Sequence, residues 1–161
     1  MSKIVSMQEL AGISSEMHAV GKKLVVTNGC FDLLHVGHVR YLQAARKLGD
    51  ALAVGVNGDD SVCALKGNGR PLNKEQDRAE VLAALGSVDY VTVFPEVRAT
   101  RFLETVRPAL YVKGGDYNSE TLDAEERAAL EKSGAQIRIL PFTEGYSTSR
   151  LVEKLGTDIE Q

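Results

Sequence analysis

Residues 24–57 read LVVTNGCFDLLHVGHVRYLQAARKLGDALAVGVN, and this stretch decides the fold. The runs 24–28 and 51–57 are almost continuously apolar, which is typical of strands that are buried on both faces. Between them, apolar residues recur at helical spacing over 39–49, and Gly49 ends the predicted helix. A strand, helix, strand unit of this kind predicts two parallel strands with the helix crossing one face of their sheet.

The same alternation continues outward from this unit. Three more strands are predicted at 90–94, 109–113 and 136–140, and further helices at 74–86, 99–107, 121–133 and 148–155. Ser6 and Glu9 have the spacing of a capping box, which predicts an N-terminal helix reaching about Val20, before Gly21. These elements predict a three-layer, Rossmann-like α/β fold with a five-stranded parallel sheet. We expect one domain over residues 1–161, with residues 1–21 packed on it as a helical segment.

Composition and charge exclude several classes of protein. The 161 residues are 43% hydrophobic, which supplies an ordinary core without disulfides or a structural metal. Lys and Arg total 19 against 22 Asp and Glu, so the formal charge of −3 argues against nonspecific binding to nucleic acid or an anionic membrane. Cys30 and Cys63 form no CxxC pair, and neither a signal peptide nor an apolar run of the ~20 residues that span a bilayer is recognisable. We therefore expect a cytoplasmic protein.

The residues that carry chemistry are expected after the strands, because ligands of such sheets bind outside the carboxyl ends of the strands. The segment 29–38, GCFDLLHVGH, follows the first strand and places His35 and His38 three residues apart at a helix start. Gly37 leaves room for a ligand there, and a helix N-terminus attracts anions. The sequence contains no GxxxxGK[ST] loop, so we interpret 29–38 as a different kind of phosphate site. The alternatives are ordinary cap histidines, or a zinc site that includes Cys30.

Two further segments follow strands. The loop 65–71, LKGNGRP, combines flexible glycines with Lys66 and Arg70, which suits closure over a polyanion; the alternative is a solvated surface loop. The segment 112–117, VKGGDY, places Lys113, Asp116 and Tyr117 around a glycine pair. That combination suits a hydroxylated, phosphorylated substrate, and the alternative is a simple turn.

At these positions the sequence resembles the HxGH nucleotidyltransferases, in particular their cytidylyltransferase-like branch. Every fixed position of its GxFDxxHxGH signature is present, as Gly29, Phe31, Asp32, His35, Gly37 and His38. EGYSTS at 144–149 is similar to the EGxS[TS] segment that precedes the last helix of that branch. A longer similarity, from about Ile4 to Leu155, is nearest to the adenylyltransferase portion of bacterial ADP-heptose synthesis enzymes, in a stand-alone form.

The resemblance implies roles for particular residues. His35, His38 and Lys66 would be catalytic. The nucleotide-binding residues would be Asn28, Gly29, Cys30, Phe31, His35, Gly37, His38, Lys66, Arg78, Gly145, Ser147, Thr148 and Ser149. The substrate-binding residues would be Asp32, Asp59, Lys113, Gly114, Asp116 and Tyr117. Asp32 has the alternative of a turn-stabilising residue, and Arg78 that of an exposed partner for Glu75. Mg²⁺ would arrive with ATP, bound mainly through its phosphates and not at a protein-only metal site.

The resemblance also implies an activity. Cytidylyltransferases of this branch usually carry arginine where this chain has Phe142, which favours adenine over cytosine. We therefore expect transfer of AMP from ATP to D-glycero-β-D-manno-heptose 1-phosphate, giving ADP-heptose and pyrophosphate for lipopolysaccharide core synthesis, by a homo-oligomer. The alternatives are a cytidylyltransferase acting on an alcohol phosphate such as glycerol 3-phosphate, and a nucleotide-binding regulatory module without turnover.

Overall fold

Five parallel strands form a single sheet in the computed structural model, which describes residues 2–115, 121–141 and 143–158. The strands are β1 (Leu24–Gly29), β2 (Ala51–Asn57), β3 (Tyr90–Phe94), β4 (Leu110–Gly114) and β5 (Gln136–Leu140). The helices are α1 (Met7–Ala19), α2 (Val36–Arg46), α3 (Asp59–Lys66), α4 (Glu75–Ala83), α5 (Thr100–Val106), α6 (Ala124–Ser133) and α7 (Thr148–Asp158). The strand order is β3-β2-β1-β4-β5, with every pair parallel, which confirms the predicted fold class.

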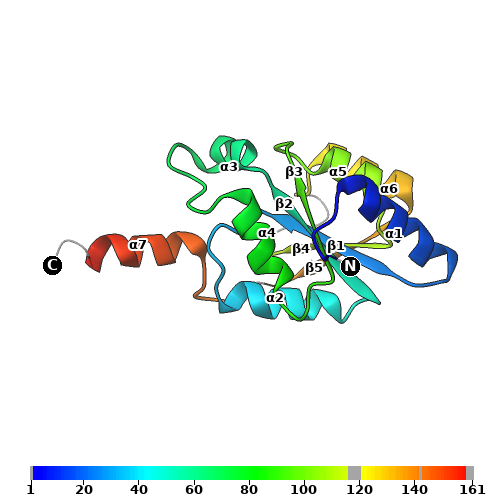
Figure 1. Cartoon of the computed structure of the whole chain (residues 1–161), viewed down its shortest axis with the longest axis horizontal. Coiled ribbons are helices and arrows are strands. Elements are labelled where there is room, and N and C mark those ends of the chain that lie inside the picture. Colours follow the sequence, from blue (N-terminus) through cyan, green and yellow to red (C-terminus); the bar gives the residue numbers. More distant parts are fainter. Residues whose placement is uncertain (1, 116–120, 142, 159–161) are drawn as a thin grey trace.

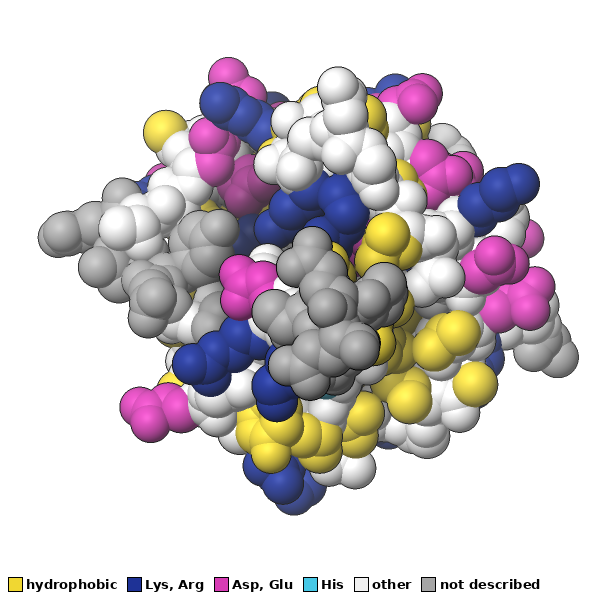
Figure 2. Space-filling model, turned by 90° about the vertical axis from the view of Figure 1, so that its left-hand side faces the viewer, with side chains coloured by type: hydrophobic (Ala, Val, Ile, Leu, Met, Phe, Trp, Pro, Cys, Tyr) yellow, Lys and Arg dark blue, Asp and Glu magenta, His cyan; other side chains and the backbone are white. Residues whose placement is uncertain are grey.

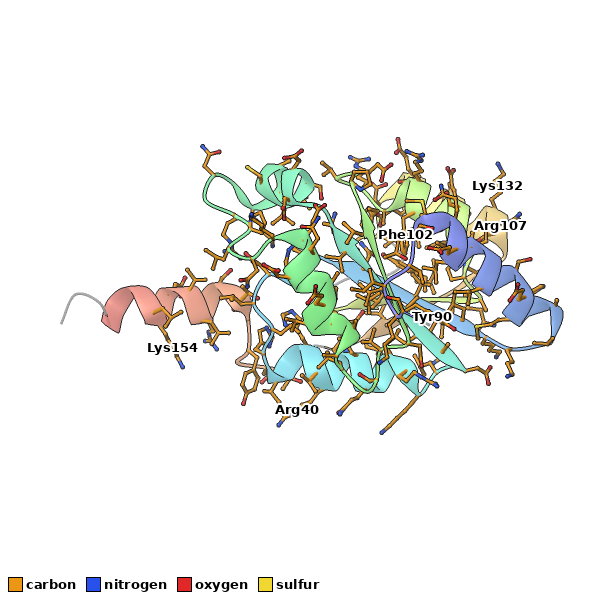
Figure 3. The ribbon with its side chains drawn as sticks, viewed as in Figure 1. Arg40, Tyr90, Phe102, Arg107, Lys132 and Lys154 are labelled. Carbon is orange, nitrogen blue, oxygen red and sulfur yellow. The ribbon has the colours of Figure 1, made fainter. Side chains whose placement is uncertain are left out.

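Helices cover both faces of the sheet, as the apolar strands require (Figure 1). Leu24 and Val26 of β1 point to a core shared with α1, α5 and α6, whereas Val25 points to a second core shared with α2 and α4. This division follows from the two-residue period of a strand. Phe102 of α5, labelled in Figure 3, lies in the first core. Its ring stacks on that of Phe94, with ring centroids 5.1 Å apart.

One helix start and one additional helix differ from the prediction for identifiable reasons. Helix α2 begins at Val36, three residues before the predicted start, because His35 is its N-cap. Helix α3 was not predicted at all. Gly58 is its N-cap, Asp59 and Asp60 occupy its first turn, and Lys66 is its last residue. The first two residues of the loop predicted at 65–71 therefore belong to this helix.

Helix α7 projects from the body of the molecule (Figure 1). Leu155 of this helix is 61% exposed, Leu151 of the same helix is exposed as well, and so is Tyr146, which lies just before the helix. No helix in the described parts of the chain is both long and apolar enough to cross a membrane.

Candidate active site

A cavity of about 910 Å³ opens at the carboxyl ends of β1 and β4, between the start of α2 and the start of α7. Figure 2 looks at the end of the molecule from which α7 projects, and Lys and Arg side chains lie on several sides of the centre of this face. Most of the predicted site residues line the cavity: Asn28, Gly29, Cys30, Phe31, Asp32, His35, Gly37, His38, Lys66, Lys113, Gly114, Ser147, Thr148 and Ser149. Residues up to 121 positions apart in the sequence therefore meet in one place.

The two histidines of the signature lie stacked at the N-terminus of α2, with ring centroids 3.9 Å apart. Nδ1 of His35 accepts a hydrogen bond from the Gly37 N–H at 3.1 Å, and Nδ1 of His38 accepts from the His35 N–H at 3.3 Å. Because each Nδ1 acts as an acceptor, each neutral ring carries its proton on Nε2. The helix start thus presents two imidazole Nε2–H donors at the cavity.

Burial keeps these rings neutral. Desolvation lowers the pKa of His35 below its ordinary value. For His38, desolvation and then the charge of His35 lower the pKa to about 4. Both effects disfavour the imidazolium form, since a buried cation loses its hydration and two cations repel each other. At neutral pH the pair consists of uncharged hydrogen-bond donors.

Gly37 is required by the packing of this helix start. A Cβ at this position would lie 2.9 Å from Cε1 and Nδ1 of His35 and 3.1 Å from Cβ of Tyr146. The centroid of the Tyr146 ring lies 6.2 Å from that of His35. Arg40 of α2, labelled in Figure 3, lies over the Tyr146 ring, with its Cζ 5.9 Å from the ring centroid. The Thr148 hydroxyl donates to the Leu33 carbonyl at 2.9 Å, which fixes the start of α7 to the signature turn.

Asp32 holds in place the segment that follows α3, residues 67–73, which contains Arg70 and is called the basic loop. Its carboxylate accepts hydrogen bonds from Arg70 Nε at 2.8 Å, from the Leu72 N–H at 2.8 and 2.9 Å, and from the Asn73 N–H at 2.9 Å. Burial raises the pKa of this carboxyl, but the Asn73 and Leu72 hydrogen bonds and the Arg70 charge outweigh it and hold the pKa below its ordinary value. These bonds agree with the alternative that Asp32 stabilises a turn, and the segment that it stabilises lies about 40 residues further along the chain.

Arg78 and Asp59 do not line the cavity, in contrast to their predicted contacts with ligands. Arg78 is 2% exposed and donates to the carbonyls of Cys30 and Asn57, each at 2.7 Å, and to Asn73 at 3.0 Å. Its Nη2 donates to Asp59 Oδ1 at 2.9 Å. Arg78 therefore ties the ends of β1 and β2 to the basic loop. The alternative partner of Arg78, Glu75, instead accepts from the Asp59 N–H at 2.7 Å.

Lys66 is exposed at the end of α3 and lines the cavity, and Arg70 lines it from the loop that follows. No hydrogen bond or ion pair of the Lys66 ammonium is found among the described residues. These two cations stand where a polyanionic ligand can meet them. Gly145 does not line the cavity and instead takes a positive φ of 85° in the turn before α7.

Sequence reasoning missed one side of the cavity. Val97 and Arg98, which precede α5, line it together with Asp123 and Glu126 at the start of α6. Arg98 pairs with Asp123 at 3.0 Å, and Glu126 accepts from the Ala99 N–H at 3.0 Å. These residues belong to no motif, and only their position after β3 and β4 signals proximity to a ligand.

The carboxylates that line the cavity are engaged by the chain itself. Asp32 binds the basic loop, Asp123 caps α6 and pairs with Arg98, and Glu126 caps the start of α5. Among the described residues, no three His, Cys, Asp or Glu side chains are placed to hold a metal ion. The alternative of a zinc site formed by His35, His38 and Cys30 is therefore not supported. Asp116, Tyr117 and Phe142 lie outside the described residues.

Comparisons with known proteins agree with this geometry. The model of the family described as cytidylyltransferase-like matches residues 26–154. Bifunctional protein HldE of Citrifermentans bemidjiense is 50% identical over 154 residues, which are 96% of this chain and 31% of that protein. The chain thus spans about a third of the length of such relatives.

Two solved structures are similar. The lipopolysaccharide core biosynthesis protein of Thermoplasma volcanium is 30% identical, with a TM-score of 0.62 over 79% of this chain and 100% of that one. A pantoate-beta-alanine ligase from Francisella tularensis, at 15% identity, has a TM-score of 0.64 over 99% of this chain and 76% of that one, which shows a shared fold. With its signature intact and the family model matching most of its length, the chain belongs to the cytidylyltransferase-like family of nucleotidyltransferases.

Proposed function

We propose that this chain transfers the adenylyl group of ATP to a sugar 1-phosphate, with D-glycero-β-D-manno-heptose 1-phosphate as the acceptor, and releases pyrophosphate. One observation carries the proposal: two neutral imidazole Nε2–H donors at a helix N-terminus line the same cavity as Lys66 and Arg70. Helix N-termini, neutral donors and cations together suit a triphosphate.

The reaction requires no covalent enzyme intermediate. A phosphate oxygen of the acceptor attacks the α-phosphorus of ATP, a new P–O bond forms, and the bond from the α-phosphorus to the bridging oxygen breaks. The bonding electrons leave with pyrophosphate, whose added charge the protein must stabilise. His35 and His38 would donate hydrogen bonds to phosphate oxygens, and Lys66 would neutralise the departing group.

The remaining residues divide between nucleotide and acceptor. Asn28, Gly29, Cys30, Phe31, Gly37 and the segment 147–149 would surround the nucleotide, because they line the cavity beside the two histidines. Lys113, Gly114, Asp116 and Tyr117 would receive the sugar phosphate after β4. In this proposal Asp59 and Arg78, which do not line the cavity, position the basic loop, and Asp32, which lines it, acts by holding Arg70.

Mg²⁺ is expected to be bound mainly through ATP, because each carboxylate that lines the cavity within the described residues is engaged by the chain itself. When bound, the ion would neutralise charge on the phosphate oxygens. The chain's own donors would then orient the triphosphate: the two imidazoles from one side, Lys66 from the end of α3 and Arg70 from the basic loop.

The choice of ATP and a heptose phosphate is supported by sequence. Phe142 stands where cytidine-specific members of the branch carry arginine, and the similarity to the adenylyltransferase portion of ADP-heptose synthesis enzymes extends over nearly the whole chain. The Thermoplasma volcanium relative carries lipopolysaccharide core biosynthesis in its name. An acceptor from that process is therefore the first to test.

A pyrophosphate-release assay tests the proposal. The purified chain is combined with ATP, CTP, GTP or UTP and, in turn, heptose 1-phosphate, other sugar 1-phosphates and glycerol 3-phosphate, and products are identified by mass spectrometry. We expect the highest kcat/KM with ATP and heptose 1-phosphate. Preference for CTP and glycerol 3-phosphate would favour the cytidylyltransferase alternative, and binding without turnover would favour a regulatory module.

We also propose that the chain acts as a homo-oligomer in the cytoplasm. The exposed Leu151 and Leu155 side chains on the projecting helix α7 support association, because exposed apolar side chains grouped on one helix mark contact surfaces. Light scattering coupled to gel filtration should give a mass above that of one chain. A monomer at micromolar concentration would contradict this part of the proposal.

A further inference from the structure

A buried tyrosine joins the acceptor side of the cavity to the nucleotide side. Tyr111 of β4 is 0% exposed, and its hydroxyl lies between two residues that line the cavity, Lys113 and Asn28. Lys113 Nζ donates to the Tyr111 hydroxyl at 3.3 Å, and that hydroxyl donates to Oδ1 of Asn28. Tyr111 belongs to none of the sequence motifs.

The strands explain why these three side chains meet. Val26 of β1 is level with Tyr111 of the neighbouring β4. Side chains two positions apart on a strand share a face, so Asn28 and Lys113 lie on the same face as that pair, one step nearer the carboxyl edge. The Tyr111 ring thus lies in the core, and its hydroxyl is hydrogen-bonded to two residues that line the cavity.

The order of donors and acceptors fixes the Asn28 amide. An ammonium group only donates, so the Tyr111 oxygen must accept from Lys113. The hydroxyl donates to Oδ1 of Asn28, so the amide presents its carbonyl oxygen, and not its NH₂ group, to Tyr111. Nδ2 of Asn28 is consequently turned away from Tyr111, and it has no hydrogen-bond partner within the described residues.

We propose that Tyr111 is a positioning residue that holds the Asn28 amide with its NH₂ group directed at the phosphates of the bound nucleotide. This inference rests on the proposed function. An acidic or freely rotating group at position 28 would present an oxygen to phosphate oxygens, which repel it. By fixing one orientation, Tyr111 supplies a preorganised donor, and its bond to Lys113 couples that orientation to the acceptor side.

A double-mutant cycle tests the proposal with Tyr111→Phe, Asn28→Ala and the double variant. If Tyr111 acts through Asn28, we expect Asn28→Ala to lower kcat/KM for the nucleotide by about 30-fold or more and Tyr111→Phe by about 10-fold. The double variant should match Asn28→Ala within about twofold. The proposal would be overturned if the loss of kcat/KM in the double variant equalled the product of the two single losses, or if Tyr111→Phe kept kcat/KM within about twofold of the native protein.

The same cycle is measured for binding of α,β-methylene-ATP by calorimetry, which needs no turnover. Coupled losses of affinity would support the proposal even if the acceptor or nucleotide assigned above proved wrong, and absence of turnover with every substrate pair would contradict only the proposed function. Independent losses of affinity would overturn the role of Tyr111.

Two further variants separate positioning from stability. Thr92→Val removes another buried hydroxyl of the sheet, which donates to the Val5 carbonyl at 3.0 Å, and we expect kcat/KM to stay within about twofold. Asn28→Asp keeps an acceptor for Tyr111 but removes the NH₂ donor. We expect it to bind α,β-methylene-ATP at least about tenfold more weakly, and native affinity would overturn the proposal even if Tyr111→Phe failed to fold.

Discussion

Arg70 Nε donates to Oδ2 of Asp32 at 2.8 Å across 38 positions of sequence, so the signature turn and the basic loop are one structural unit. The carboxylate is buried, whereas the Arg70 side chain reaches the cavity. In the proposed function, Asp32 therefore acts through Arg70, the cation that it holds.

Asp32→Asn should raise KM for ATP by a larger factor than it lowers kcat. The amide keeps the size of the side chain but loses its charge, so Arg70 and the Leu72 and Asn73 N–H groups lose a strong acceptor. We expect KM for ATP to rise about tenfold with a smaller change in kcat, and the free energy of unfolding to fall by about 1–3 kcal/mol. Steady-state kinetics and urea unfolding measure both.

The pH dependence of that stability has a defined sign. Because the folded-state pKa of Asp32 lies below its ordinary value, the contribution of Asp32 to the free energy of unfolding is present above that ordinary value and is lost as pH falls through the folded pKa.

Asp60→Asn, which changes an exposed carboxylate of α3, is the control for the kinetic prediction and should leave KM for ATP unchanged. A rise in KM for the acceptor alone would contradict the role given to Asp32.

His38→Ala should lower kcat by about 100-fold or more, the order expected when a preorganised donor to developing charge is lost. Circular dichroism should show an unchanged fold. His18→Ala, on the exposed side of α1, serves as the control and should retain native kcat. A kcat for His38→Ala within a few-fold of native would show that this imidazole does not bind the reacting phosphates.

Gly37→Ala should impair catalysis although alanine favours helices. The added Cβ would lie 2.9 Å from the His35 ring and would displace it. We expect kcat/KM to fall at least about tenfold. In Gly12→Ala, on α1, the added Cβ meets nothing within 4 Å, so this variant should gain up to about 1 kcal/mol of stability with native activity. Equal activities of the two variants would exclude steric control by Gly37.

His38 should titrate near pH 4 in the free protein, because burial and then His35 disfavour its charged form. The unfolded chain binds this proton at an ordinary pKa of about 6.5, so the contribution of His38 to stability is present above that pH and is lost toward pH 4. Proton NMR of the imidazole follows the titration directly. Pyrophosphate should raise the pKa by stabilising the imidazolium, and an apo value near 6.5 would contradict the burial of the ring.

The sequence predicts the strands better than the surroundings of the ligand. Continuous apolar runs have one stable environment, a sheet covered on both faces, so β2, β3 and β5 have their predicted bounds. The histidines were predictable because local spacing sets their geometry. Asp32 with Arg70, Arg78 with Asp59, and the Arg98 side of the cavity depend on contacts between distant segments. A single sequence carries no periodic signal for such contacts.

The hydrogen bond from Thr148 to Leu33 also bears on how the protein is made. Thr148 is synthesised 115 residues after its partner, which at about 5–20 residues per second means a delay of roughly 6–23 s. At the start of that interval the nascent chain contains β1, and α2 and β2 are added early in it, but the signature turn still lacks its contact with α7. The nucleotide site proposed above is therefore completed only after Thr148 has been synthesised, and removal of residues 148–158 would leave the signature turn without this contact.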